Sequence, residues 1–291
     1  MRTMSVVIAA DGTDASRSAT VWAAAEAARR GQLLQVLHVL DWEWSTARYE
    51  FSNDRFDADR RHADGIVAQA ARVAREAVPA IEVVSDVLVG DPAAQLVAAS
   101  ESAALMVLGD RGRGGFAGLR LGSVSQRVAT HARCPVAVIR GGLRSAEALV
   151  VAGVDDSAAA GGVLDAAFTA ADQRHARLLL VHSSLPPFRG YHGHLSAAES
   201  HTPDHDTAAR DLLAHQAAPW QARFPAVAVD LLVSHLGPAA ALVGAARDAE
   251  LVIAGSRGHG VLAGTLLGST GLQLLHYADC PVLIIHPYPK S

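Results

Sequence analysis

The stretch that decides the fold is rich in glycine and occurs twice. Residues 109–123 read GDRGRGGFAGLRLGS, and residues 255–269 read GSRGHGVLAGTLLGS, so both follow the pattern G-x2-G-x9-G-S. The same offset of 146 residues relates the Cys-Pro-Val run at 134–136 to the one at 280–282. Upstream, Asp11 and Asp155 each end an apolar run, and there the offset changes by only two. The chain is therefore a tandem duplication of a unit of about 145 residues.

Each copy alternates short apolar runs with alanine-rich segments of helical length, which is typical of βαβ units and a parallel sheet. The first copy predicts strands at 4–10, 33–39, 82–89, 105–109 and 136–140, and helices at 15–30, 54–78, 92–102 and 123–131. The second copy predicts strands at 149–154, 178–182, 227–233, 251–255 and 282–286, with helices between them. A polar stretch at 141–146 separates the copies. We expect an α/β protein with domains at 1–142 and 147–291.

Composition and charge exclude several classes of function. The formal net charge is −4 and the pI is near 6.4, so the chain has no basic field for nucleic acid. No segment approaches an apolar membrane span and the start does not resemble a signal peptide, so we expect a cytoplasmic protein without a membrane partner. The one lysine, Lys290, is next to the last residue, which excludes a phosphate-loop, kinase or Schiff-base lysine within a domain. Cys134 and Cys280 lie at matching places, which favours a repeated packing role over a disulfide.

The glycine pattern has a physical reason to bind phosphate. A predicted strand ends at Gly109 and a predicted helix begins at Gly122-Ser123. Glycine lets the backbone approach a ligand closely, and a helix N-terminus presents unpaired N–H groups and a positive dipole end. A glycine-rich turn with Ser123 as an ordinary helix cap is the alternative. Two loops of identical spacing, each after a predicted strand, favour phosphate binding.

An aspartate follows the first predicted strand of each copy. Asp11 and Asp155 can accept hydrogen bonds from ribose or adenine groups. Taken alone, each predicts a helix cap, since an aspartate followed by Thr13 or Ser157 favours a helix start. In combination with the glycine loop they favour a ligand. Open parallel sheets bind ligands at the carboxyl ends of strands, where the strand order reverses.

These residues resemble the universal stress protein domain in both halves, and the resemblance covers nearly the whole chain. It rests on the pattern G-x2-G-x9-G-[ST], the strand-one aspartate and the closing Cys-Pro-Val strand. It implies two tandem Rossmann-like domains, each an open five-stranded parallel sheet of order 3-2-1-4-5 with helices on both faces. It also implies ATP with Mg²⁺ in the cleft between strands one and four, pairing through the fifth strand, and a homodimer. A regulatory binding protein of the stress response, with at most slow ATP hydrolysis and a protein partner still unknown, is the implied function.

The resemblance also names the nucleotide contacts, motif position by motif position. In the first copy they are Asp11, Val39, Gly109, Arg111, Gly112, Gly114, Gly122, Ser123 and Val124. In the second copy they are Gly153, Asp155, Ser183, Gly255, Ser256, Arg257, Gly258, Gly260, Gly268, Ser269 and Thr270.

The first copy departs from the family pattern at two positions. Ala9 stands where many relatives, and Gly153 in the second copy, have glycine, and Asp110 stands where a hydroxyl residue such as Ser256 is usual. A carboxylate beside a triphosphate repels it unless Mg²⁺ or Arg111 intervenes. We therefore expect a weaker or more Mg²⁺-dependent first site.

Other functions remain open as alternatives. Gly112, Gly114 and Ala117 imitate a dinucleotide fingerprint, but they follow the fourth strand and no acidic residue lies about 20 positions on, so an oxidoreductase is not favoured. A metal-binding regulator would use Zn²⁺ in a histidine-rich insert, although its irregular spacing is more typical of a solvated lid. The insert contains His182, His192, His194, His201 and His205, with Asp204 and Asp206. A nucleotide-hydrolysing enzyme is the other alternative, and no catalytic residue can be nominated for it.

Overall fold

The strands form at the apolar runs and the helices at the alanine-rich segments that the sequence predicts. The structure, a computed structural model, describes residues 4–42, 53–112, 120–140, 148–157, 159–184, 203–258 and 267–287. The chain divides between residues 143 and 144 into two compact units. The domain limits at 142 and 147 stay predictions.

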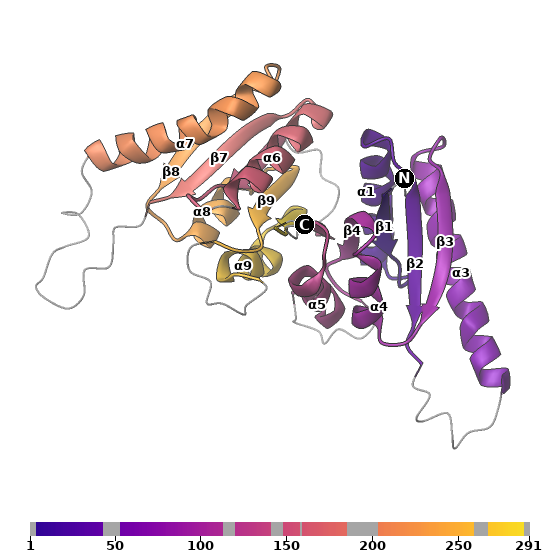
Figure 1. Cartoon of the computed structure of the whole chain (residues 1–291). Helices are drawn as coiled ribbons and strands as arrows, with labels where there is room; N and C mark the ends of the chain where they lie inside the picture. The colour runs from indigo at the N-terminus through magenta and orange to yellow at the C-terminus, as the bar shows by residue number, and fades with distance from the viewer. Residues whose placement is uncertain are drawn as a thin grey trace, which may run out of the picture. The chain divides into compact units, whose positions relative to one another are not determined.

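In the first unit, the strand that begins the chain lies in the middle of the sheet. β1 pairs with β2 and with β4, while β3 pairs with β2 and β5 with β4, all in parallel. Helices α1 and α3 pack together on one face, and α4 and α5 on the other (Figure 1). The strands are β1 (Ser5–Ala9), β2 (Leu34–Leu40), β3 (Val83–Val89), β4 (Ala103–Gly109) and β5 (Val136–Ile139), and the helices are α1 (Asp14–Arg29), α3 (Asn53–Ala77), α4 (Pro92–Ala99) and α5 (Ser123–His131).

The second unit repeats this arrangement. β6 pairs with β7 and with β9, β8 pairs with β7, and β10 with β9, again in parallel. Helices α6 and α7 pack together, as do α8 and α9. The strands are β6 (Leu149–Gly153), β7 (Arg177–Ser183), β8 (Val229–Ser234), β9 (Leu251–Gly255) and β10 (Val282–Ile285), and the helices are α6 (Ala160–Arg174), α7 (Pro203–Arg223), α8 (Pro238–Ala245) and α9 (Ser269–Tyr277).

The pairing brings the predicted motifs to one edge of each sheet. The carboxyl ends of parallel strands lie at the same edge, and the winding reverses between β1 and β4 and between β6 and β9. The aspartate after the first strand therefore lies beside the glycine loop after the fourth. The predicted α/β class with two tandem Rossmann-like units is confirmed. Pairing of the copies through their fifth strands, and a homodimer, stay predictions.

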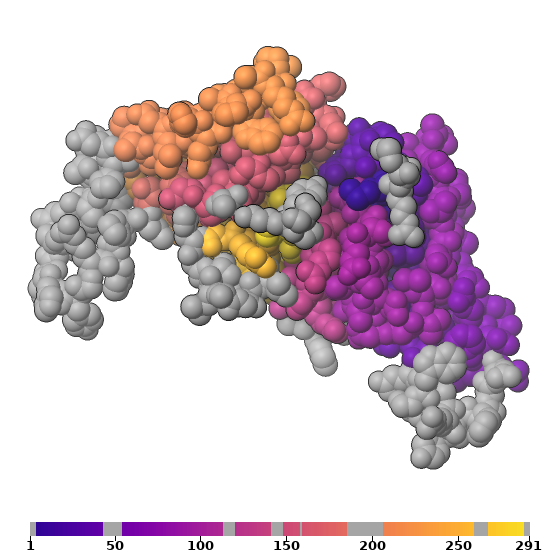
Figure 2. All heavy atoms as spheres, viewed as in Figure 1, coloured from indigo at the N-terminus to yellow at the C-terminus, as the bar shows by residue number. Residues whose placement is uncertain are grey.

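Small side chains let the helices pack closely on the sheets. The inward face of α1 carries Ala19, Ala23 and Ala27, all fully buried. In the second unit the fully buried Phe168 of α6 stacks on Phe224, with ring centroids 6.0 Å apart. Figure 2 shows the side chains of α7, in orange, covering one side of this unit. Of the helices in the described ranges, none is long and apolar enough to cross a membrane.

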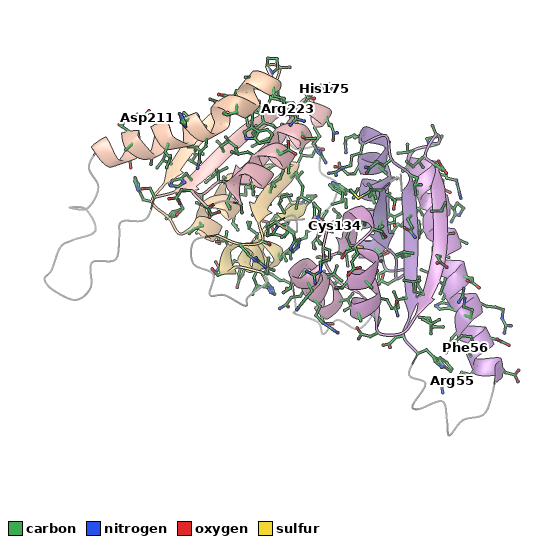
Figure 3. All side chains as sticks on the ribbon, viewed as in Figure 1. Arg55, Phe56, Cys134, His175, Asp211 and Arg223 are labelled. Carbon is green, nitrogen blue, oxygen red and sulfur yellow. The ribbon has the colours of Figure 1, made fainter. Side chains whose placement is uncertain are left out.

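The two cysteines occupy matching buried turns. Cys134, labelled in Figure 3, lies between α5 and β5, and Cys280 lies between α9 and β10; each is 5% exposed. Neither of them forms a disulfide. Burial raises the pKa of the Cys134 thiol to about 12, although backbone hydrogen bonding at Met106 opposes the shift. The predicted packing role is consistent with this environment.

We expect Cys134 to be inert toward thiol reagents in the folded protein. The thiolate is the reactive form, and a pKa of about 12 leaves about one thiol in ten thousand ionised at about pH 8. A Cys280→Ser variant isolates the reaction of Cys134, which should be at least about a hundredfold slower in buffer than in denaturant. Equal rates under the two conditions would contradict the buried placement.

Candidate functional site

A backbone hydrogen bond ties the two ends of each glycine loop together. Gly268 donates from its amide to the carbonyl of Ser256 at 2.7 Å, and Gly122 donates to the carbonyl of Asp110 at the same distance. Helix α9 then begins at Ser269 and helix α5 begins at Ser123. No side-chain hydrogen bond caps either helix. The serines are therefore the first helical residues and glycines are the capping residues. The alternative of an ordinary serine cap is wrong, and the N-terminal amides are available to a ligand.

The second unit has a cavity of about 690 Å³ at the carboxyl ends of β6, β7 and β9. Its walls come from the loop after β6, the ends of β7 and β9, and the first turns of α6, α8 and α9. Nine of the predicted contacts line it: Gly153, Asp155, Ser183, Gly255, Arg257, Gly258, Gly268, Ser269 and Thr270.

Two other predicted contacts of the second copy, Ser256 and Gly260, are not among the residues that line the cavity. Ser256 is 1% exposed and does not belong to the cavity lining, and its Oγ is buried without a hydrogen-bond partner. The predicted nucleotide contact of Ser256 therefore has no support from the cavity geometry. Gly260 lies outside the described residues, as does Gly114 in the first copy.

The aspartate after the first strand of each unit accepts hydrogen bonds from the turn that follows it. It also lies against the second glycine of the glycine loop in the same unit. Asp155 accepts through Oδ1 from the amide and hydroxyl of Ser157, at 3.1 and 2.6 Å. A Cβ added to Gly258 would lie 2.7 Å from the other oxygen, Oδ2. In the first unit, a Cβ on Gly112 would lie 2.8 Å from Oδ2 of Asp11. A side chain at either place would require the aspartate or the glycine loop to shift, so glycine suits both positions.

This combination of loops agrees with comparisons to known proteins. A model of the universal stress protein family matches residues 3–140 and again residues 149–286. The chain belongs to the universal stress protein family. A universal stress protein of Mycobacterium tuberculosis strain H37Rv is 34% identical over 96% of both chains.

A solved universal stress protein of similar length shares the fold. The structure of one from Archaeoglobus fulgidus DSM 4304 covers 98% of this chain and 99% of its own, with a TM-score of 0.73 at 20% identity. A shorter one from Archaeoglobus fulgidus, solved in complex with dAMP, covers 48% of this chain at 26% identity and a TM-score of 0.38.

The first universal stress protein unit builds the same loop frame with different side chains around it. Gly109 packs against α1, where an added Cβ would lie 3.0 Å from the backbone of Ala15, and its carbonyl accepts from the Ser125 hydroxyl at 2.8 Å. Asp11 accepts through Oδ1 from the amide and hydroxyl of Thr13, at 3.0 and 2.7 Å. Val39 lies near the end of β2, which pairs with β1, while Ser123 and Val124 begin α5.

The carboxylate of Asp110 faces arginines. Its Oδ2 lies 3.9 Å from Nε of Arg140 and 3.9 Å from Nε of Arg111. Arg140, whose side chain is 8% exposed, also donates from an Nη atom to the carbonyl of Arg120 at 2.9 Å. Two cations thus offset the charge of Asp110. The two arginines reduce the expected repulsion of a triphosphate by this carboxylate, and a weaker first site stays a prediction.

Sequence reasoning did not assign the histidine near the end of each second strand to the site. Nδ1 of His182 lies 2.9 Å from the carbonyl of Val154, and Nδ1 of His38 lies 2.6 Å from the carbonyl of Ala10. His182 lines the cavity and belongs to β7, so it is a strand residue as well as the start of the histidine-rich stretch. The signal was present, because His38 and His182 share the offset of 144 that relates Asp11 to Asp155.

The metal hypothesis falls largely on residues outside the described ranges. His192, His194 and His201 lie there, and the side chains of Asp204 and His205 are likewise not described. Asp206 accepts from, or pairs with, Nε2 of His235 at 3.1 Å. Within the described ranges, no group of three or more histidine, cysteine or acidic side chains could hold a metal ion.

We expect Arg140→Met to lower the free energy of unfolding of the first unit by about 2 kcal/mol. A buried ion pair that loses one partner costs more, but Asp110 keeps Arg111 and is 17% exposed. The double variant Asp110→Ser/Arg140→His, which installs the residues of the second unit, should recover most of the loss. Urea denaturation followed by circular dichroism provides the measurement, with the exposed Arg111→Met as control. Equal losses in the single and double variants would contradict the pairing.

Proposed function

We propose that the second unit binds ATP together with Mg²⁺, and that the protein is a regulatory nucleotide-binding protein of the stress response. One observation carries the proposal: a cavity of about 690 Å³ joins the carboxyl ends of three parallel strands to the N-terminus of α9. Small-molecule sites commonly have volumes of about 300–1,000 Å³. Open parallel sheets bind their ligands at this edge, beside the point where the winding reverses.

The groups that suit phosphates gather at the α9 side of the cavity. Gly258 and Gly268 line the cavity and carry no side chains of their own, and Ser269 and Thr270 lie in the first turn of α9. The helix start supplies amide donors and a positive dipole end. Arg257 adds the cationic side chain among the cavity-lining residues. Together these groups compensate several negative charges without a lysine.

The strand order favours one direction for the proposed nucleotide. β9, β6 and β7 are consecutive neighbours, and adjacent strands are about 4.8 Å apart. The ends of β9 and β7 are therefore separated by about 10 Å, with Asp155 after β6 between them. With the phosphates at the β9 side, we propose that the ribose lies near Asp155 and the base at the end of β7. Val181, Pro238 and Leu242 supply apolar surface there.

Mg²⁺ fits the oxygen-rich side chains of this cavity. The hydroxyls of Ser269 and Thr270 and the carboxylates of Asp155 and Asp156 all line it, and Mg²⁺ takes oxygen ligands together with phosphates. Asp156, Ser269 and Thr270 would hold the ion, which would neutralise part of the phosphate charge. Asp155 is already bonded to Ser157 through Oδ1, so we assign it to positioning. We propose a binding protein, with ATP hydrolysis at most slow. A cytoplasmic location and a homodimer remain proposals from the sequence.

The direct test is mass spectrometry of the denatured, purified protein, which should release an adenine nucleotide, followed by calorimetric titration with ATP and Mg²⁺. Titration of the nucleotide-free protein without detectable binding of ATP, ADP or AMP would refute the proposal.

We expect Gly258→Ala to weaken ATP binding at the second unit at least about tenfold. The new Cβ would lie 2.7 Å from Oδ2 of Asp155, whose position is fixed by Ser157, so the loop must move away from the phosphates. Gly244→Ala in α8 is the matched control, because nothing lies within 4 Å of its added Cβ. Calorimetry of both variants should separate them. Equal ATP affinity in the two would show that the loop does not touch the nucleotide.

A further inference from the structure

The histidine at the end of β7 has one ring nitrogen committed to the backbone. Nδ1 of His182 lies 2.9 Å from the carbonyl oxygen of Val154, at the end of the neighbouring strand β6. A carbonyl oxygen only accepts hydrogen bonds, so Nδ1 must carry the proton. In the neutral ring, Nε2 is then an acceptor with a lone pair. The contact with Val154 thus fixes both the orientation of the ring and its tautomer.

The other nitrogen is available to a ligand. His182 is half-buried and lines the cavity, and in the described part of the chain Nε2 has no hydrogen-bond partner. The neighbouring hydroxyl of Ser183 is engaged, since it donates to the carbonyl of Leu236 at 2.7 Å. At this end of the cavity, His182 therefore offers an unused acceptor in a fixed position. A ligand group that meets Nε2 must donate a hydrogen bond.

We propose that His182 reads the base: its Nε2 accepts a hydrogen bond from the 6-amino group of adenine. This inference rests on the proposed function and deepens it, because the strand order places the base at the end of β7. Hypoxanthine and guanine carry a 6-oxo group, an acceptor that would face another acceptor there. His182 is then the residue that makes the second unit select 6-amino purines.

The two chemical roles of the ring can be separated by substitution. In His182→Asn, the side-chain amide nitrogen replaces Nδ1 and can still donate to Val154, but no atom replaces Nε2. In His182→Gln, the amide group extends to the place of Nε2. The asparagine variant should keep the fold and lose the selection, whereas the glutamine variant, which can turn its amide oxygen toward the base, should retain part of it.

The experiment compares ATP with inosine triphosphate. The base of inosine triphosphate carries a 6-oxo group in place of the 6-amino group, and a proton on the adjacent ring nitrogen. Calorimetric titrations run at about pH 8, where imidazole is in general neutral. We expect the unmodified protein to prefer ATP about tenfold, and His182→Asn to bring the ratio near one mainly by weakening ATP. His215→Asn, at an exposed position on α7 outside the cavity, should leave the ratio unchanged.

Several results would overturn the inference. An unchanged ratio in a folded His182→Asn variant that still binds ATP would show that Nε2 does not meet the 6-amino group. A fall in the preference for ATP over 2′-deoxy-ATP, without a change against inosine triphosphate, would assign the acceptor to the ribose instead. A ratio that changes in His38→Asn alone would place the selection in the first unit. Failure of the unmodified protein to bind any adenine nucleotide would refute the proposed function itself, and is thereby distinguished from the other results.

Discussion

The amide of Gly268, bonded to the carbonyl of Ser256, holds the start of helix α9 against the end of strand β9. The rest of the site depends on this constraint. With the loop ends tied, the helix N-terminus faces the edge of the sheet where Asp155 emerges from β6, and the intervening glycine can press against that carboxylate. The same hydrogen bond, at the same length, occurs between Gly122 and Asp110. The frame is therefore built from backbone atoms, and the side chains around it are free to differ.

The two units use that freedom beside the loop. Where the first unit has Asp110 and Arg140, the second has Ser256 and His286 at the equivalent ends of strands four and five. In the first unit the arginine reaches both the carboxylate at the start of the loop and the carbonyl of Arg120 near its end. A charged bridge thus supports one loop, while the other is supported without it. The difference concerns how the loop is held, since Ser256 does not reach the cavity.

Much of this could be predicted from the sequence because it depends on the backbone. Alternating apolar and alanine-rich runs located all ten strands that the structure describes, and the repeated glycine spacing located the loops. The directions of individual side chains could not be predicted. Ser256 lies between the glycines in the sequence, yet its side chain is buried away from the cavity, because the residue after a strand end takes its direction from the pleat and the following turn. His182 was overlooked as a site residue since its contact with Val154 joins two strands that are 28 residues apart in the chain.

The contact between the second glycine and the strand-one aspartate bears on how a duplicated gene diverges. A Cβ at Gly112 or Gly258 would press on a carboxylate from a segment about 100 residues away, so a single codon change there strains the loop without removing any side chain from the buried sheets. Two such tandem halves mutate independently at this contact. One copy can drift toward a scaffold or a new ligand under relaxed selection while its twin retains the ancestral site. The duplication therefore gives the lineage two copies of this contact, one of which can change while the other is kept.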